Sequence, residues 1–185
     1  DWIVIGSHGH GGWRHAILGS VAERTVREAP CAVLTARSDD KPKHILVGAD
    51  LSHHSDRALA VGAELAGEFD AKLELVHALH APVPFVTPYE VVLPDAVIES
   101  AFETAERELE RMAREFAPGV KLTTAVLAEP PHAALCDAAE RDGADLIVVG
   151  CHGHSGLKHL VIGGVAERVL RHAPCSVLTV REPTG

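Results

Sequence analysis

The hydrophobic residues from position 43 onward follow two alternating spacings. Short uninterrupted apolar runs are typical of buried strands, and apolar residues three and four positions apart are typical of amphipathic helices. The prolines between positions 81 and 95 predict a loop. The expected strands are 44–49, 72–78, 120–127, 145–149 and 175–180, and the expected helices are 55–69 (with Ser55 as its N-cap), 95–117, 131–141 and 161–172.

This alternation predicts an α/β fold. Because crossovers between parallel strands are right-handed, the five strands are expected to form one doubly wound parallel sheet with helices on both faces, in a Rossmann-like arrangement. Only 4% of the residues are aromatic, so the core is expected to consist of Ala, Val, Leu and Ile, which suits packed helices and parallel strands. Sheets of this class bind ligands at the carboxyl ends of their strands.

The sequence of the first 37 residues is repeated near the end of the chain. Asp1–Arg37 matches Asp145–Arg181 without a gap at an offset of 144 residues, and 22 of the 37 positions are identical. A period of this length corresponds to a whole small domain. We therefore expect 1–37 to be the C-terminal remnant of a first domain, 38–42 to be a linker and 43–181 to be a complete second domain. About 107 residues of the first domain, the offset of 144 less the 37 present, are expected upstream.

Charge and composition narrow the expected partners. The formal net charge of −9 and the pI of about 5.8 argue against sequence-independent binding of nucleic acid, because such binding depends on Lys and Arg side chains. No apolar run reaches the roughly 18 residues of a membrane span, so a membrane is not an expected partner. The four cysteines lack CxxC spacing and are expected to be reduced, which fits a cytoplasmic location.

The thirteen histidines raise the question of a metal site. The closest pairs are His8 with His10, His53 with His54, and His152 with His154. None has the helical HxxxH spacing or a neighbouring Cys or carboxylate set that would complete a tetrahedral site. No structural metal is therefore expected.

Two glycine-rich segments carry the candidate chemistry. Gly150 and Gly153 follow the strand 145–149, and nine residues later Gly163, Gly164 and Val165 open a helix. Glycines let a phosphate approach the backbone, and amides at a helix start point at the anion. A G-x-x-G pair alone is equally consistent with an ordinary tight turn. The first copy has the equivalent residues Gly6, Gly9, Gly19 and Ser20.

The full pattern resembles the universal stress protein family. The resemblance rests on the glycine spacing, the Val-Ala-Glu-Arg helix, the Ala-Pro-Cys-x-Val-Leu strand and the opening segment 44–52, with Asp50 at the acidic position. It covers 43–181 as one domain and 1–37 as the end of another. It implies the strand order 3-2-1-4-5 and a stress-response regulatory or signalling protein that binds an adenine nucleotide, ATP or AMP, with or without magnesium.

The resemblance also implies which residues form the nucleotide pocket. Ala49 and Ala78 would line the base pocket, and Asp50 would lie near the adenine or the ribose. Asp50 has an alternative role as a helix-capping or turn carboxylate. The ribose and phosphates would contact Gly150, Gly153, Gly163, Gly164 and Val165, and in the first copy the equivalent positions are Gly6, Gly9, Gly19 and Ser20.

One position departs from the family pattern. The Ser or Thr that ends the glycine motif is Gly164 in the complete domain, so a hydroxyl is lost and binding is expected to weaken by about 1 kcal/mol. Two other functions stay open: a dimerisation or interaction module with a decayed site, and a slow ATP hydrolase. Because no Walker lysine and no motif-supported Ser-His-Asp set is present, at most weak ATPase activity is expected.

The last strand of each copy is apolar and is expected at a sheet edge. Unprotected edges tend to pair, so 32–36 and 176–180 are expected to join two copies, as a homo-oligomer or as a pseudo-dimer. The family resemblance implies the same pairing. The segment at residues 1–6 has the pattern of a buried strand, so Trp2 is expected in the core.

Overall fold

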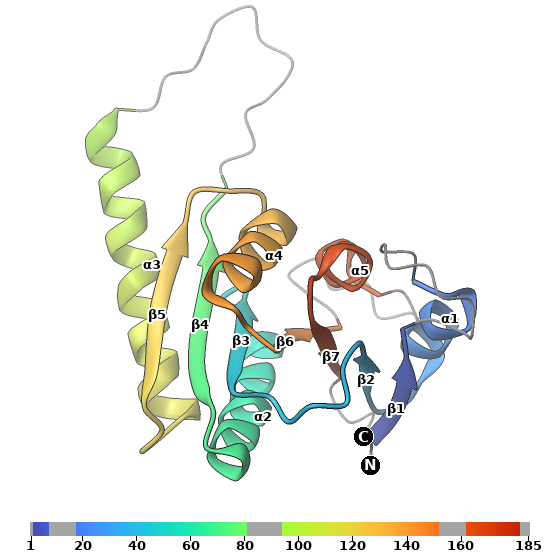
Figure 1. Ribbon diagram of the computed structural model, residues 1–185. Helices are drawn as coiled ribbons and strands as arrows, with labels where there is room; N and C mark the ends of the chain where they lie inside the picture. The colour runs from blue at the N-terminus through green and yellow to red at the C-terminus, as the bar shows by residue number, and fades with distance from the viewer. Residues whose placement is uncertain (1, 8–17, 81–93, 152–161, 182–185) are drawn as a thin grey trace, which may run out of the picture.

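The computed structural model describes residues 2–7, 18–80, 94–151 and 162–181 (Figure 1). The predicted strands and helices of the second repeat are all present, with boundaries shifted by a few residues at most. The start expected for the last helix, Val161, lies outside the described residues. The elements are β1 (Trp2–Gly6), α1 (Ser20–Glu28), β2 (Ala32–Ala36), β3 (His44–Ala49), α2 (His53–Phe69), β4 (Lys72–Ala78), α3 (Asp95–Phe116), β5 (Leu122–Leu127), α4 (Pro131–Asp142), β6 (Leu146–Gly150), α5 (Gly164–His172) and β7 (Ser176–Val180).

The strands form one sheet in the order β1-β2-β7-β6-β3-β4-β5. The part β5-β4-β3-β6-β7 is the expected order 3-2-1-4-5, and all its neighbours are parallel. The expected number of five strands is too low, because β2 pairs antiparallel with β7 and β1 pairs with β2. The fold is therefore α/β, with a mostly parallel seven-stranded sheet.

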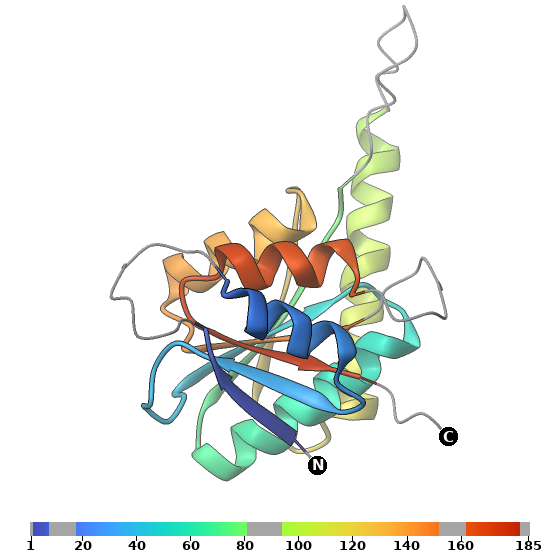
Figure 2. The ribbon, with the colours of Figure 1, turned by 90° about the vertical axis from the view of Figure 1, so that its right-hand side faces the viewer.

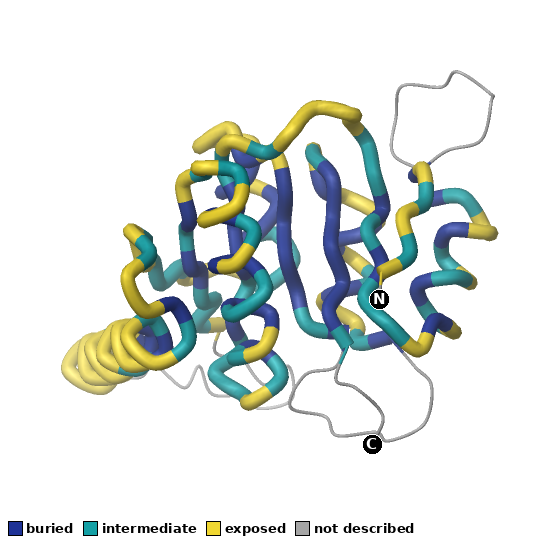
Figure 3. The backbone as a smooth tube through the Cα atoms, turned by 90° about the horizontal axis from the view of Figure 1, so that it is seen from below, coloured by how far each residue is buried: buried dark blue, intermediate teal, exposed yellow. Residues whose placement is uncertain are grey.

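Helices cover both faces of this sheet (Figures 1 and 2). Side chains alternate along each strand, so consecutive residues enter two different cores. Ile45 of β3 packs in the core that contains Leu59 of α2 and Leu109 of α3, whereas Leu46 packs in the core that contains Leu170 of α5. In Figure 3, residues along the central strands are coloured as buried. The carboxyl ends of the parallel strands are thus held between two helical layers.

β2 and β7 form the seam between the two repeats. Their antiparallel register sets Leu34 opposite Leu178. Arg37, which follows β2, donates to a carbonyl oxygen of α5 (2.9 Å), and Arg181, which follows β7, donates to a carbonyl oxygen of α1 (3.0 Å). The pairing of 32–36 with 176–180 is therefore present within one chain, and each repeat sends an arginine to a helix of the other.

β1 is not the buried strand that its sequence predicts. Trp2 and Val4 are 45% and 66% exposed, whereas their equivalents in β6, Leu146 and Val148, are 5% and 0% exposed. β6 lies between β3 and β7 and contacts α2, but in the described residues β1 pairs only with β2. The expectation that Trp2 is a core residue is wrong, because a second strand and a covering helix are needed to bury this position.

α2 begins earlier than its pattern predicts. The helix starts at His53 with Ser52 as its N-cap residue, so the expectation that Ser55 is the N-cap is wrong. Ser55 lies in the first turn, and its hydroxyl donates to the Ser52 carbonyl oxygen (2.7 Å). The connection from β3 to α2 is therefore only three residues long, Asp50 to Ser52.

Candidate functional site

A cavity of about 360 Å³ opens at the carboxyl ends of β3, β4 and β6. It lies at the switch point of the sheet, where β3 is followed by α2 on one face and the neighbouring β6 is followed by α5 on the other face. Parallel α/β sheets bind ligands at such a position. The first residues of α4 and α5 complete its walls.

Most of the predicted pocket residues meet in this cavity. Gly153 and Gly9 lie outside the described residues. Gly6, Gly19 and Ser20 belong to the equivalent segment of the first repeat and do not line this cavity. The predicted residues that line it are Ala49, Asp50, Ala78, Gly150, Gly163, Gly164 and Val165.

One end of the cavity is the N-terminus of α5. The helix begins at Gly164, with Gly163 at the N-cap position and no side-chain capping bond. The Gly163 amide donates to the Cys151 carbonyl oxygen (2.7 Å), and the Cys151 amide donates to the Val180 carbonyl oxygen (2.8 Å), which ties this end to β7. The first amides of a helix have no intrahelical acceptor, and the helix dipole adds partial positive charge there. The amides at this end of the cavity can therefore donate hydrogen bonds to a phosphate.

The first repeat has two backbone hydrogen bonds equivalent to those of Gly163 and Cys151. The Gly19 amide donates to the Ser7 carbonyl oxygen (3.2 Å), and the Ser7 amide donates to the Ala36 carbonyl oxygen (2.9 Å). α1 then begins at Ser20, the hydroxyl-bearing equivalent of Gly164. Within the described residues, however, no strand equivalent to β3 lies beside β1. In the described part of the first repeat, the N-terminus of α1 therefore has no strand equivalent to β3 opposite it.

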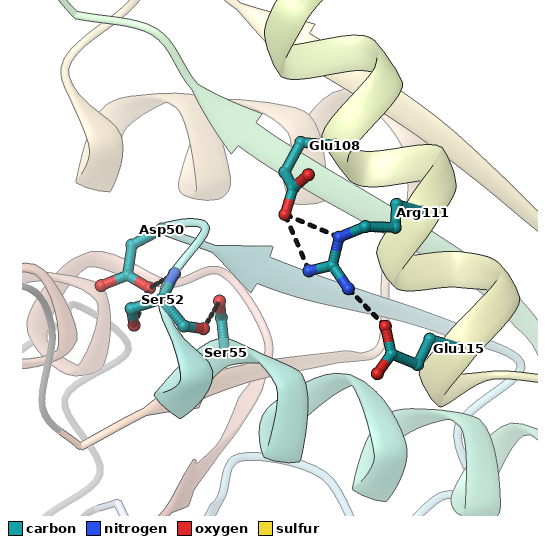
Figure 4. Close-up of polar contacts among 6 residues, drawn as sticks. All are labelled: Asp50, Ser52, Ser55, Glu108, Arg111 and Glu115. Atoms are coloured by element: carbon teal, nitrogen blue, oxygen red, sulfur yellow. Dashed lines mark hydrogen bonds and ion pairs between the residues drawn. The ribbon is translucent and has the colours of Figure 1, made fainter.

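Asp50 lines the other end of the cavity, directly after β3. Its Oδ1 accepts two hydrogen bonds from Ser52, one from the amide (3.1 Å) and one from the hydroxyl (2.5 Å), as Figure 4 shows. Leu51 between them has a left-handed backbone conformation, with φ of 61°. Asp50 is thus a turn carboxylate, which was one of its expected roles, and it also lines the cavity.

His77 fixes the residue before Asp50. Its Nδ1 forms a hydrogen bond with the Ala49 carbonyl oxygen (2.9 Å), across the β3–β4 pair. Because a carbonyl oxygen only accepts, Nδ1 carries the proton. Sequence reasoning missed His77 as a cavity residue, although its position next to Ala78 at a strand end was a usable signal.

The cavity floor is apolar and depends on Gly48, which sequence reasoning also missed. A Cβ at this position would lie 2.7 Å from Leu135 Cδ1 and 3.2 Å from Val149 Cγ1, and both side chains line the cavity. Val76 and Ala78 extend the same apolar surface. An apolar surface of this kind suits an aromatic ring such as a nucleobase.

Other features of the described residues narrow the chemistry available outside the cavity. They include no group of three or more His, Cys, Asp or Glu that could hold a metal ion. Burial raises the pKa of Cys136 to about 11 and that of Cys175 to about 12, so both thiols are protonated and poorly nucleophilic at neutral pH. Arg111, also drawn in Figure 4, is bound by Glu108 and Glu115 of its own helix. In the described part of the chain no helix is long and apolar enough to cross a membrane.

Comparison with known proteins identifies the family. A sequence model of the universal stress protein family matches residues 1–37 and 41–181. The chain belongs to the universal stress protein family. A universal stress protein of Thermus aquaticus is 37% identical over 146 residues, which cover 75% of this chain and 98% of that protein. A universal stress protein of Mycobacterium tuberculosis is 34% identical over 192 residues, which cover 98% of this chain but only 62% of the longer mycobacterial protein.

Solved structures of universal stress proteins have the same Rossmann-like fold. A putative universal stress protein from Pseudomonas aeruginosa superposes with a TM-score of 0.70 at 21% identity and covers 98% of this chain and 63% of its own. A universal stress protein in complex with cAMP has a TM-score of 0.53 at 24% identity and covers 78% of this chain and 100% of its own. At these identities the likeness concerns the fold.

Proposed function

We propose that this universal stress protein binds an adenine nucleotide, ATP or AMP, in the cavity at the ends of β3, β4 and β6, and that it acts as a regulatory or signalling module in the stress response. The observation that carries the proposal is that Asp50 and the glycine-rich start of α5 line one cavity. The cAMP complex of a structural relative supports an adenine-containing ligand. We expect the protein in the cytoplasm, where its cysteines stay reduced.

Each wall of the cavity matches one part of an adenine nucleotide. The apolar floor around Gly48 and Leu135 suits the base. Asp50 accepts hydrogen bonds, so it suits an amino group of the base or a hydroxyl of the ribose. The amides of Gly164 and Val165, the first two of α5, suit the phosphates. Magnesium, if it accompanies ATP, would bind mainly to phosphate oxygens and water.

We further propose that residues 1–37 are the C-terminal part of a first universal stress protein domain, 38–42 a linker and 43–181 a complete second domain. The family match in two segments and the greater length of the mycobacterial relative support this division. The exposed Trp2 and Val4 support it as well, since their equivalents in β6 are buried by β3 and α2. In this division the β2–β7 seam is the contact between two domains, as in a pseudo-dimer.

One observation favours an alternative function. Gly164 lacks the hydroxyl that its equivalent Ser20 carries, while the β2–β7 seam is well formed. A protein that has lost nucleotide binding but kept this seam would act as an interaction module. The two functions differ in whether the cavity binds a nucleotide.

Titration calorimetry with AMP and with ATP tests the proposal. The protein is expected to bind at least one of them with a micromolar Kd, and Asp50→Ala is expected to weaken binding about tenfold or more. Asp56→Ala is the matched control, because Asp56 lies on α2 nearby but does not line the cavity. No heat of binding at millimolar nucleotide, together with no nucleotide released on denaturation of the purified protein, would favour the interaction module.

A further inference from the structure

The hydroxyl of Ser52 does not act as a normal helix cap. Ser52 is the N-cap residue of α2, a position where a serine hydroxyl usually accepts a hydrogen bond from an amide of the first turn. No such bond is present at α2. The hydroxyl donates instead to Asp50 Oδ1 (2.5 Å), and the Ser52 amide donates to the same oxygen (3.1 Å).

These two bonds fix the orientation of a carboxylate that lines the cavity. With two donors on Oδ1, the side chain of Asp50 cannot rotate without breaking one of them, so the plane of the carboxylate is set. Ser52 itself is not a lining residue, so it reaches a ligand only through Asp50.

Ser52 is held in turn by the first turn of α2. Its carbonyl oxygen accepts hydrogen bonds from both the amide (3.0 Å) and the hydroxyl (2.7 Å) of Ser55, as Figure 4 shows for the hydroxyl. On the other side of Asp50, the His77 ring fixes the Ala49 carbonyl oxygen (2.9 Å). The turn that presents Asp50 is therefore anchored from α2 and from β4 before any ligand arrives.

We propose that Ser52 is a positioning residue for nucleotide binding, whose hydroxyl holds the Asp50 carboxylate in the orientation that the ligand requires. This inference rests on the proposed function. Preorganisation raises affinity because the cost of ordering the side chain is met in the free protein. Loss of the Ser52 hydroxyl is thus expected to weaken binding through Asp50 and not by any contact of its own.

Ser52→Thr and Ser52→Val form a matched pair for the test. Thr and Val have the same shape, and the extended backbone of residue 52 (φ −95°, ψ 163°) accepts a β-branched side chain, so both variants are expected to fold. Only Thr keeps the hydroxyl. By AMP calorimetry, Ser52→Thr is expected to bind like the parent, and Ser52→Val is expected to bind about five- to tenfold more weakly.

A double-mutant cycle shows whether the effect passes through Asp50. In the Asp50→Ala background, Ser52→Val is expected to cause no further loss of AMP affinity, because no carboxylate is left to position. Equal binding by the Thr and Val variants, or losses that multiply in the double variant, would overturn the positioning role while the proposed function stands. If the parent binds no AMP or ATP, the proposed function fails and the inference fails with it.

Discussion

Replacing Gly164 by serine is expected to strengthen nucleotide binding. Gly164 is the first residue of α5 and lines the cavity, and its equivalent in the first repeat is Ser20. Among the described residues, a Cβ at Gly164 would meet no atom within 4 Å, so a serine side chain fits there. The backbone amide at this position is kept, and a hydroxyl donor is added beside it.

The magnitude follows from one added hydrogen bond. A hydrogen bond that replaces one to water contributes about 0.5–1.5 kcal/mol, which corresponds to an increase in affinity of about two- to tenfold. Serine is also a better helix residue than glycine, so the variant is expected to be slightly more stable. The gain in affinity and the gain in stability have different causes and are measured separately.

The assay is calorimetry with AMP and ATP at a single salt concentration, beside thermal unfolding without ligand. Gly67→Ser is the matched control, since a Cβ at Gly67 of α2 also meets nothing within 4 Å and Gly67 does not line the cavity. The control is expected to change stability but not Kd. An unchanged or weaker affinity in Gly164→Ser, with normal folding, would refute the assignment of the phosphates to the start of α5.

Two further predictions concern the cavity floor and the thiols. Gly48→Ala is expected to weaken AMP binding by about tenfold or more, because the new Cβ would lie 2.7 Å from Leu135 Cδ1 and displace this side chain into the cavity; a parent-like Kd by calorimetry would contradict this. The melting temperature is expected to fall as the pH rises above about 9, because burial raises the pKa of Cys136 to about 11 and of Cys175 to about 12, so these thiols ionise in the unfolded chain before they ionise in the folded one. A Cys136→Ala, Cys175→Ala double variant is expected to show a flatter decline, and an equal slope would argue against buried thiols as the cause.

Much of the fold follows from local patterns in the sequence. The apolar run at 44–49 coincides with β3, and the glycines at 163 and 164 do mark the start of a helix. These features can be predicted from the sequence because a buried strand and a helix start depend mainly on nearby residues. Other roles could not be predicted in this way, because they depend on contacts that form only on folding. These are the contacts of Ser52 with Asp50, of His77 with Ala49 and of Gly48 with Leu135.

The two repeats show why the sequence of a site does not by itself define a site. Trp2 and Leu146 stand at equivalent positions of nearly the same segment, yet one is exposed and the other is buried, because only β6 has β3 beside it and α2 over it. The same difference applies to the glycine motif. The first repeat has the hydroxyl of Ser20 and the equivalent backbone hydrogen bonds, but among the described residues it lacks a strand that would carry an equivalent of Asp50. Nucleotide binding by this chain is therefore expected at the second repeat. The glycine motif there lacks the serine hydroxyl, but both Asp50 and the start of α5 line the cavity.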